Sequence, residues 1–301
     1  MGFIILVWFI VQTDNTCHSL PMKSHFLILA KLCARVLRRG DRKAFERGVF
    51  AISACFFITL GGCAGRGVMP LESWVGNHDV LWRWDEAARL RVGDLGGERA
   101  LGTTLYIEGD GLAYIDAATP SRDPTPRVPV GLTLALANRQ GGRVMYMGRP
   151  CQWQGGQRRT ACGDYRVWTE RRFVPEILGS QVAVALREAG DTEPVRVVGF
   201  SGGAVIAQLV AVAFQEQGRE VDLVTYGGNL MPERVNAHHR VPTPEGWVKM
   251  SDFADDLRRI SSTHYVGQSD KVVPPALTRE MAAIVGGEVV VVAGGHQDYA
   301  E

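Results

Sequence analysis

The chain has 301 residues, of which 46% are hydrophobic, and this is enough for one large α/β domain or two small ones. Charged residues make up 22% and aromatic residues 8%, a globular composition that excludes an intrinsically disordered chain. No segment reaches about 18 uncharged apolar residues, so we expect no transmembrane helix in the mature protein. The formal net charge of +1 combines a basic first part with an acidic remainder.

Residues 1–62 have the pattern of an export signal. They contain eight Lys and Arg against three acidic residues. A basic cluster at 38–43 precedes an apolar run over 49–60 and small residues at 61–65, which is the order of regions in an export signal. We therefore exclude residues 1–62 from the fold. The segment is about twice the usual length, and a translation start nearer Val36 or Leu37 is the simplest account of that length.

The end of this segment, Leu60-Gly61-Gly62-Cys63, resembles a bacterial lipobox. In such signals the cysteine is lipidated and becomes the first residue of the mature chain, so the resemblance implies that Cys63 is the lipid attachment site. Ala64 is similar to the residue found in lipoproteins sorted to the outer membrane. This implies a lipid-anchored protein of the cell envelope, facing the periplasm of a Gram-negative bacterium. The alternative is an ordinary cleaved signal with an incidental cysteine.

Next in the chain, the glycine-rich residues 63–77 are predicted to be a tether, and residues 78–301 are predicted to form the domain. Residues 78–100 are expected to supply early antiparallel strands. Beyond them the apolar patterns predict strands over 103–107 and 143–147, a helix over 132–138 and a proline-rich loop over 120–130.

The rest of the domain alternates between short apolar runs and amphipathic segments. Strands are predicted over 195–198, 223–226, 263–266 and 288–292, and helices over 173–188, 204–217, 252–260 and 275–285. This alternation predicts a mostly parallel sheet with helices on both faces. The long connection 229–251 is a candidate lid, and we expect its neighbouring His238 and His239 to be solvated.

A possible nucleophile lies between the strand at 195–198 and the following helix. The residues Gly199-Phe200-Ser201-Gly202-Gly203 match the pattern G-x-S-x-G in the strand–turn–helix context that this motif requires. A serine at this turn is held in a strained conformation at the end of the sheet. We therefore predict that Ser201 is a nucleophile, and that the backbone N–H of Gly202 stabilises an oxyanion.

An acid and a histidine follow in the chain order that such a serine requires. Asp270 follows the strand at 263–266, and His296 follows the strand at 288–292 through two glycines. Parallel strands end at one edge of a sheet, so both side chains can reach Ser201. His296 is predicted to accept the serine proton while Asp270 holds the other ring nitrogen. The alternatives are a turn-capping aspartate and a surface histidine.

Together these residues resemble the α/β-hydrolase fold, and the likeness covers about residues 100–301. Within that fold the chain is similar to small exported bacterial hydrolases through its loops at 108–111, 123–126 and 149–152, the last reading Arg-Pro-Cys-Gln. The resemblance implies that the Asp110 backbone N–H is the second oxyanion donor. Many relatives have His-Gly where this chain has Glu108-Gly109. We expect the carboxylates of Glu108 and Asp110 to point away from the anion or to bond elsewhere.

Beyond Cys63, the mature domain contains two cysteines, Cys151 and Cys162. A pair in an exported protein favours a disulfide, and two free thiols are the alternative. A disulfide here would stiffen one wall of the pocket. Trp153, Tyr165 and Trp168 either line that pocket or pack in the ordinary way. We expect no metal site, because two cysteines do not complete a structural zinc site and the chain has no H-E-x-x-H motif.

The sequence therefore predicts an exported, lipid-anchored serine hydrolase that cleaves carboxylic esters or related acyl compounds through an acyl-enzyme, without a cofactor. Its expected partner is a small acyl or ester substrate. Residues 63–301 carry a net charge of −4, which gives no electrostatic case for nucleic acid. The alternatives are a peptidase, thioesterase or acyltransferase of the same fold, or a non-catalytic envelope lipoprotein that uses the scaffold for binding.

Overall fold

The computed structural model describes residues 69–299 apart from 117–118, 140, 155–161, 163, 165 and 192–193. The predicted export signal, Cys63 and residues 64–68 of the predicted tether lie outside the described residues. Within the described ranges, no helix is long and apolar enough to cross a membrane.

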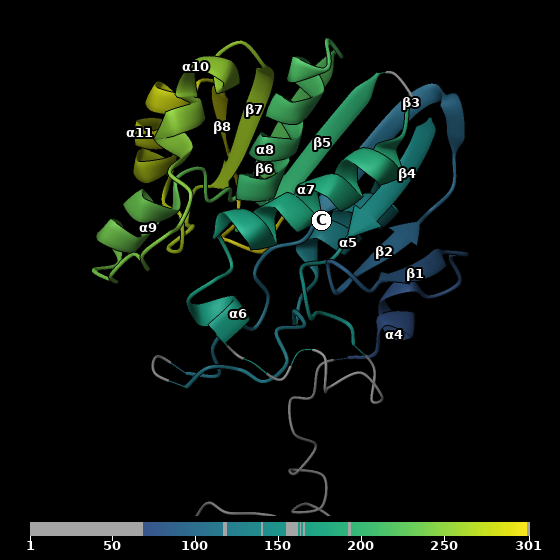
Figure 1. Ribbon diagram of the computed structural model, residues 1–301, viewed down its shortest axis with the longest axis horizontal. Coiled ribbons are helices and arrows are strands. Elements are labelled where there is room, and N and C mark those ends of the chain that lie inside the picture. Colours follow the sequence, from purple (N-terminus) through teal and green to yellow (C-terminus); the bar gives the residue numbers. More distant parts are fainter. Residues whose placement is uncertain are drawn as a thin grey trace, which may run out of the picture. The chain divides into compact units, whose positions relative to one another are not determined.

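An eight-stranded sheet with the strand order β1-β2-β4-β3-β5-β6-β7-β8 forms the centre of the protein (Figure 1). The first two strands form an antiparallel pair, and β2 is antiparallel to β4. All neighbours from β4 to β8 are parallel. The strands are β1 (Leu81–Asp85), β2 (Leu90–Asp94), β3 (Glu98–Ile107), β4 (Gly142–Met147), β5 (Val195–Phe200), β6 (Val221–Tyr226), β7 (Ser261–Gly267) and β8 (Glu288–Val292).

Both faces are buried in the middle of the sheet, over most of β4, β5 and the second half of β3, as the continuous apolar strands predict. On β5 the side chains alternate: Val195 and Val197 join one apolar cluster, and Val198 and Phe200 join a second cluster on the opposite face. The first cluster is covered by α7, α8, α10 and α11, and the second by α4 and α5. The prediction of a mostly parallel sheet with helices on both faces is therefore confirmed.

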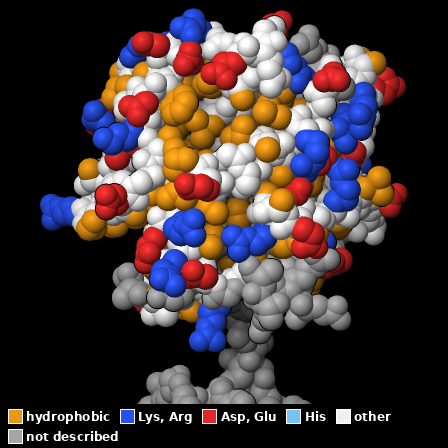
Figure 2. Space-filling view, in the orientation of Figure 1, with side chains coloured by type: hydrophobic (Ala, Val, Ile, Leu, Met, Phe, Trp, Pro, Cys, Tyr) orange, Lys and Arg blue, Asp and Glu red, His pale blue; other side chains and the backbone are white. Residues whose placement is uncertain are grey.

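The helices begin and end close to where sequence periodicity places them. Pro175 opens α7 at a position where its missing N–H is not needed, and Gly190 follows its last residue. The helices are α4 (Leu71–Val75), α5 (Val130–Ala137), α6 (Arg166–Thr169), α7 (Pro175–Ala189), α8 (Gly203–Glu216), α9 (Pro232–His238), α10 (Ala254–Leu257) and α11 (Pro275–Val285). Figure 2 shows charged side chains of both signs around an apolar area over α7 and α8, where Val182, Leu186 and Leu209 are partly buried.

Three segments differ from the sequence expectation. The helix α4 lies inside the predicted tether, and its Leu71 and Val75 are buried in the second cluster, so this part of the chain packs on the domain. The strand β3 begins at Glu98, ahead of a register shift that interrupts its pairing with β4 before Thr103. The helix predicted over 252–260 is a 3₁₀ turn at Met250–Phe253 followed by the short α10.

Candidate active site

Ser201 lies on the turn that joins β5 to α8, in the left-handed backbone region with φ of 48°. Non-glycine residues adopt this region at a cost of about 1–3 kcal/mol, and such strain is concentrated at functional sites. The turn is held on both sides, because the Ser201 N–H donates to Tyr226 O at 3.0 Å and its carbonyl accepts from Ala204 and Asn229. A Cβ at Gly203 would lie 2.4 Å from the Glu108 carbonyl oxygen, which explains the last glycine of the motif.

The three predicted catalytic side chains form a continuous hydrogen-bonded array. His296 Nε2 lies 3.0 Å from Ser201 Oγ, and His296 Nδ1 lies 2.8 Å from Asp270 Oδ2. The other oxygen of Asp270 accepts the N–H groups of Val272 and Val273 at 2.8 and 2.9 Å. The structure therefore brings Ser201, His296 and Asp270 together in the predicted order.

The local environment favours the ionised form of Asp270. Burial acts to raise the pKa of this carboxyl, but the hydrogen bond and charge of His296, with the two backbone N–H groups, outweigh burial and lower the pKa. The Asp270 side chain is fully buried, whereas that of His296 is 15% exposed. An ionised aspartate in this position can hold the proton on Nδ1 and leave Nε2 free to accept the serine proton.

The parallel strands explain why residues so far apart in sequence meet. Ser201, Asp270 and His296 follow the carboxyl ends of β5, β7 and β8, which share one edge of the sheet. The two loops beyond β7 and β8 are tied directly, because Gly294 O accepts from the Ser269 N–H at 3.0 Å and from Ser269 Oγ at 2.7 Å.

The carboxylate of Glu108 is bonded elsewhere, as expected for this acidic loop. It accepts the N–H groups of Gly109, Gly131 and Leu132, of which the last two belong to the first turn of α5. The hydroxyl of Tyr146 donates to the same carboxylate at 3.2 Å. Burial raises the pKa of Glu108, although these hydrogen bonds act to lower it. Glu108 therefore caps a helix and fixes the loop after β3.

The side-chain carboxylate of Asp110 lies directly beside Gly202, the other residue predicted to supply an oxyanion donor. A Cβ at Gly202 would lie 2.1 Å from Asp110 Oδ1. The carboxylate forms ion pairs with Arg149 Nη1 at 2.8 Å and Arg172 Nε at 3.0 Å. Two cations thus neutralise the charge of the Asp110 carboxylate. This agrees with the expectation that the carboxylate is bonded elsewhere.

The two arginines are functional candidates that sequence reasoning missed. Arg149 is fully buried and also donates from Nε to Gln181 at 2.7 Å, and burial lowers the pKa of its guanidinium. Arg172 lies over the rings of Phe173 and Trp247 at 5.3 and 4.9 Å. The Arg-Pro-Cys-Gln segment after β4 was a signal for Arg149, since it leaves the edge of the sheet that carries Ser201.

The predicted disulfide is present, and it joins Cys151 to Cys162 with Cα atoms 5.6 Å apart. Trp153, a candidate for pocket lining, is instead a buried core residue whose indole N–H donates to Tyr146 at 3.0 Å. Trp153 therefore packs in the core. Its indole N–H donates to the Tyr146 hydroxyl, which in turn donates to Glu108. Tyr165 and the Trp168 side chain lie outside the described residues.

The candidate lid 229–251 contains α9, and Trp247 near its C-terminal end packs against the domain. The Trp247 indole packs edge-on to Phe173 at 4.8 Å and donates to Glu170 O. His238 and His239 are exposed, in line with the expectation that they are solvated, and His239 contacts Val272 O at 2.7 Å. No group of three or more possible metal ligands occurs among the residues that the structure describes.

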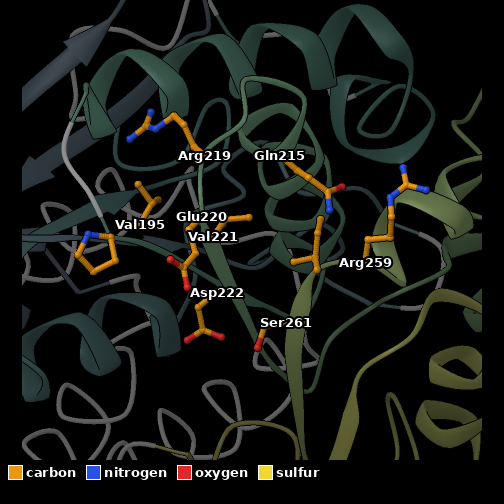
Figure 3. Close-up of a pocket in the computed structure, with 10 residues that line it drawn as sticks. Val195, Gln215, Arg219, Glu220, Val221, Asp222, Arg259 and Ser261 are labelled. Atoms are coloured by element: carbon orange, nitrogen blue, oxygen red, sulfur yellow. The ribbon is translucent and has the colours of Figure 1, made fainter.

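A separate cavity of about 560 Å³ lies at the opposite edge of the sheet, where β5, β6 and β7 begin (Figure 3). Its charged walls carry both signs, from Arg219, Arg259, Glu220 and Asp222. Because Ser201 follows the other end of β5, this cavity is no part of the site described above.

Comparisons with known proteins found one family match and a set of similar solved structures. The family described as Serine hydrolase (FSH1) matches residues 159–297, and no curated protein matches the chain. Among solved structures, a CIB-like hydrolase from Thermoplasma acidophilum shares 16% identity over 74% of this chain and 91% of its own, with a TM-score of 0.46. Est1E from Butyrivibrio proteoclasticus shares 11% over 73% and 91%, with a TM-score of 0.47.

An α-beta serine hydrolase homologue from Coxiella burnetii shares 16% identity over 77% of this chain and 91% of its own, with a TM-score of 0.43. The family match covers the segment that carries Ser201, Asp270 and His296. The chain has the α/β-hydrolase fold, and the hydrogen-bonded array of these three side chains lies in the segment, residues 159–297, that is similar to the serine hydrolase family.

Proposed function

We propose that the protein cleaves carboxylic esters of small acyl substrates through an acyl-enzyme at Ser201. The observation that carries this proposal is the array in which His296 lies 3.0 Å from Ser201 Oγ and 2.8 Å from Asp270. In the first step Ser201 Oγ attacks the ester carbonyl carbon while His296 Nε2 takes the serine proton. Asp270 stabilises the resulting imidazolium.

The tetrahedral intermediate carries its negative charge on the former carbonyl oxygen. The backbone N–H groups of Gly202 and Asp110 are the proposed donors to this oxygen, and preorganised donors of this kind lower the barrier directly. Collapse of the intermediate breaks the bond to the alkoxy group, which leaves as an alcohol with the proton from His296. Water then attacks the acyl-enzyme with the same histidine as base, which releases the acid and restores Ser201.

The test is Ser201→Ala, measured by hydrolysis of p-nitrophenyl esters and by labelling with a fluorophosphonate probe. Both signals should vanish in the variant, because the attacking oxygen is removed. An unchanged rate in Ser201→Ala would refute the mechanism. A wild-type protein that is folded but unlabelled would instead favour a scaffold used for binding. Matched amide and thioester substrates in the same assay separate an esterase from a peptidase or a thioesterase.

The lipid anchor and envelope location are a separate proposal, supported by the lipobox-like residues ending at Cys63. The disulfide Cys151–Cys162 adds support, because disulfides persist in oxidising compartments such as the periplasm. Metabolic labelling with a palmitate analogue tests the anchor. We expect label in the wild type and none in Cys63→Ala, and equal labelling of both would overturn the proposal.

A further inference from the structure

The hydroxyl of Tyr299 lies on the turn that presents Asp270. Its oxygen accepts the Gly267 N–H at 2.9 Å, and the hydroxyl donates to Asp270 Oδ2 at 3.4 Å. Gly267 and Asp270 are the first and last residues of that turn, which is closed by the Asp270 N–H donating to Gly267 O at 3.0 Å. A single phenol oxygen therefore joins both ends of the turn.

The ring of Tyr299 extends these contacts to the rest of the array. It lies 6.3 Å from the ring of Phe200, the residue before Ser201, and 5.4 Å from that of Tyr226. The Phe200 ring in turn lies 5.2 Å from His296. Tyr299 follows His296 by three residues and so belongs to the loop that carries the histidine. From this loop its side chain contacts both the segment before Ser201 and the turn that carries Asp270.

We infer that Tyr299 is a positioning residue, which sets the orientation and basicity of Asp270 and, through it, of His296. This inference rests on the proposed function of the same site. Because the Gly267 N–H already occupies the phenol oxygen as a donor, the phenol proton is directed to Asp270 Oδ2, the atom that His296 Nδ1 also contacts. The tyrosine and the histidine thus share one carboxylate oxygen.

The tyrosine remains a donor wherever the enzyme works. Burial and the nearby charges of Asp270 and Asp298 raise the pKa of Tyr299 well above its usual value, although the Gly267 N–H acts to lower it. Near Asp270 and His296, the titratable groups are Tyr299 and Asp298 from the same loop as the histidine. Tyr226 from β6 packs against the Tyr299 ring, and Tyr265 from β7 stacks on Tyr226.

Removal of the hydroxyl has a defined sign. Without this donor, one hydrogen bond that stabilises the negative charge on Asp270 Oδ2 is lost. The carboxylate then interacts more strongly with the protonated His296 ring. The acid limb of the activity profile should then move to higher pH. The turn also loses the link between its two ends, and a small displacement of Asp270 lowers kcat more than it changes KM.

The experiment compares Tyr299→Phe with Tyr265→Phe. Both delete one phenol oxygen from the same aromatic cluster and keep the ring, but Tyr265→Phe deletes none of the hydrogen bonds to Asp270 described above. The first readout is the titration of the His296 ring by NMR, which needs no substrate. The second is the pH dependence of kcat/KM for a p-nitrophenyl ester, with circular dichroism to verify folding.

We expect the His296 midpoint and the acid limb to rise by about half a pH unit in Tyr299→Phe, with kcat lower by about fivefold. Tyr265→Phe should match the wild type in both. A midpoint and kcat in Tyr299→Phe equal to those of Tyr265→Phe would overturn the inference, even if the melting temperature falls. Failure of the proposed function would be seen separately, as wild-type protein whose ester turnover does not depend on Ser201.

Discussion

Gly202→Ala tests how the loop that carries Asp110 is held in place. The new Cβ would lie 2.1 Å from Asp110 Oδ1 and 2.5 Å from its Cγ, far inside van der Waals contact. The carboxylate does not yield easily, since Arg149 Nη1 holds Oδ1 at 2.8 Å and Arg172 holds Oδ2 at 3.0 Å. The methyl group must therefore displace the Asp110 segment and break its pairing with a fully buried arginine.

The magnitude follows from these contacts. Breaking a buried ion pair costs about 3–5 kcal/mol, but the Asp110 side chain is 21% exposed and water can replace part of the interaction. We expect the free energy of unfolding to fall by about 2 kcal/mol. Displacement of the Asp110 backbone should remove one of the two proposed oxyanion donors, and we therefore expect kcat to fall by about 100-fold with little change in KM.

The assay is p-nitrophenyl ester turnover with urea unfolding of the same samples. Gly179→Ala on α7 is the matched control, because nothing lies within 4 Å of a Cβ there and we expect no loss of activity. Asp110→Ala supplies a double-mutant cycle, since it removes the atoms that the new methyl group strikes. Gly202→Ala should then add little further loss. Additive losses, or a kcat within twofold of the wild type in Gly202→Ala alone, would refute the reasoning.

Three further outcomes are expected. Glu108→Gln should lower the free energy of unfolding by about 2 kcal/mol in urea titrations, because an amide nitrogen would face groups that donate to the carboxylate. Replacing Cys151 and Cys162 by serine should remove about 3 kcal/mol, the value for a loop closed over 11 residues, and a change below about 1 kcal/mol would contradict the structure. The pKa of Asp270 is lower in the folded protein than the unfolded value of 3.8, so its ionised carboxylate stabilises the fold fully above pH 3.8 and this contribution is lost as pH falls through the folded pKa. Asp270→Asn lacks this contribution and should therefore lose less stability than the wild type in urea titrations at decreasing pH.

Much of the scaffold could be predicted because its signals are local. Each strand and the following helix differ in period, and Ser201 lies in a turn that a five-residue motif specifies. Asp270 and His296 were within reach of the same reasoning, because the carboxyl ends of parallel strands share one edge. The antiparallel β1 and β2 were expected over 78–100, and the structure places them there.

The missed residues act across long sequence separations. Arg149 pairs with Asp110 over 39 positions, and Tyr299 meets Asp270 over 29. No spacing rule links such partners, since their contact depends on how the loops at one sheet edge fold against each other. The helix α4 escaped prediction for another reason: it has five residues, and its two buried side chains, Leu71 and Val75, are too few to show a period.

The strand β8 has a consequence for how the protein behaves at high concentration. Among the strands that the structure describes, it is the last of the sheet and pairs with β7. Its sequence is Glu288 followed by four valines, of which Val291 is 39% exposed. An edge strand with high β-propensity and a single charge offers backbone groups to a strand from another molecule. Val291→Lys would therefore be the first change to make on this strand in order to oppose such pairing.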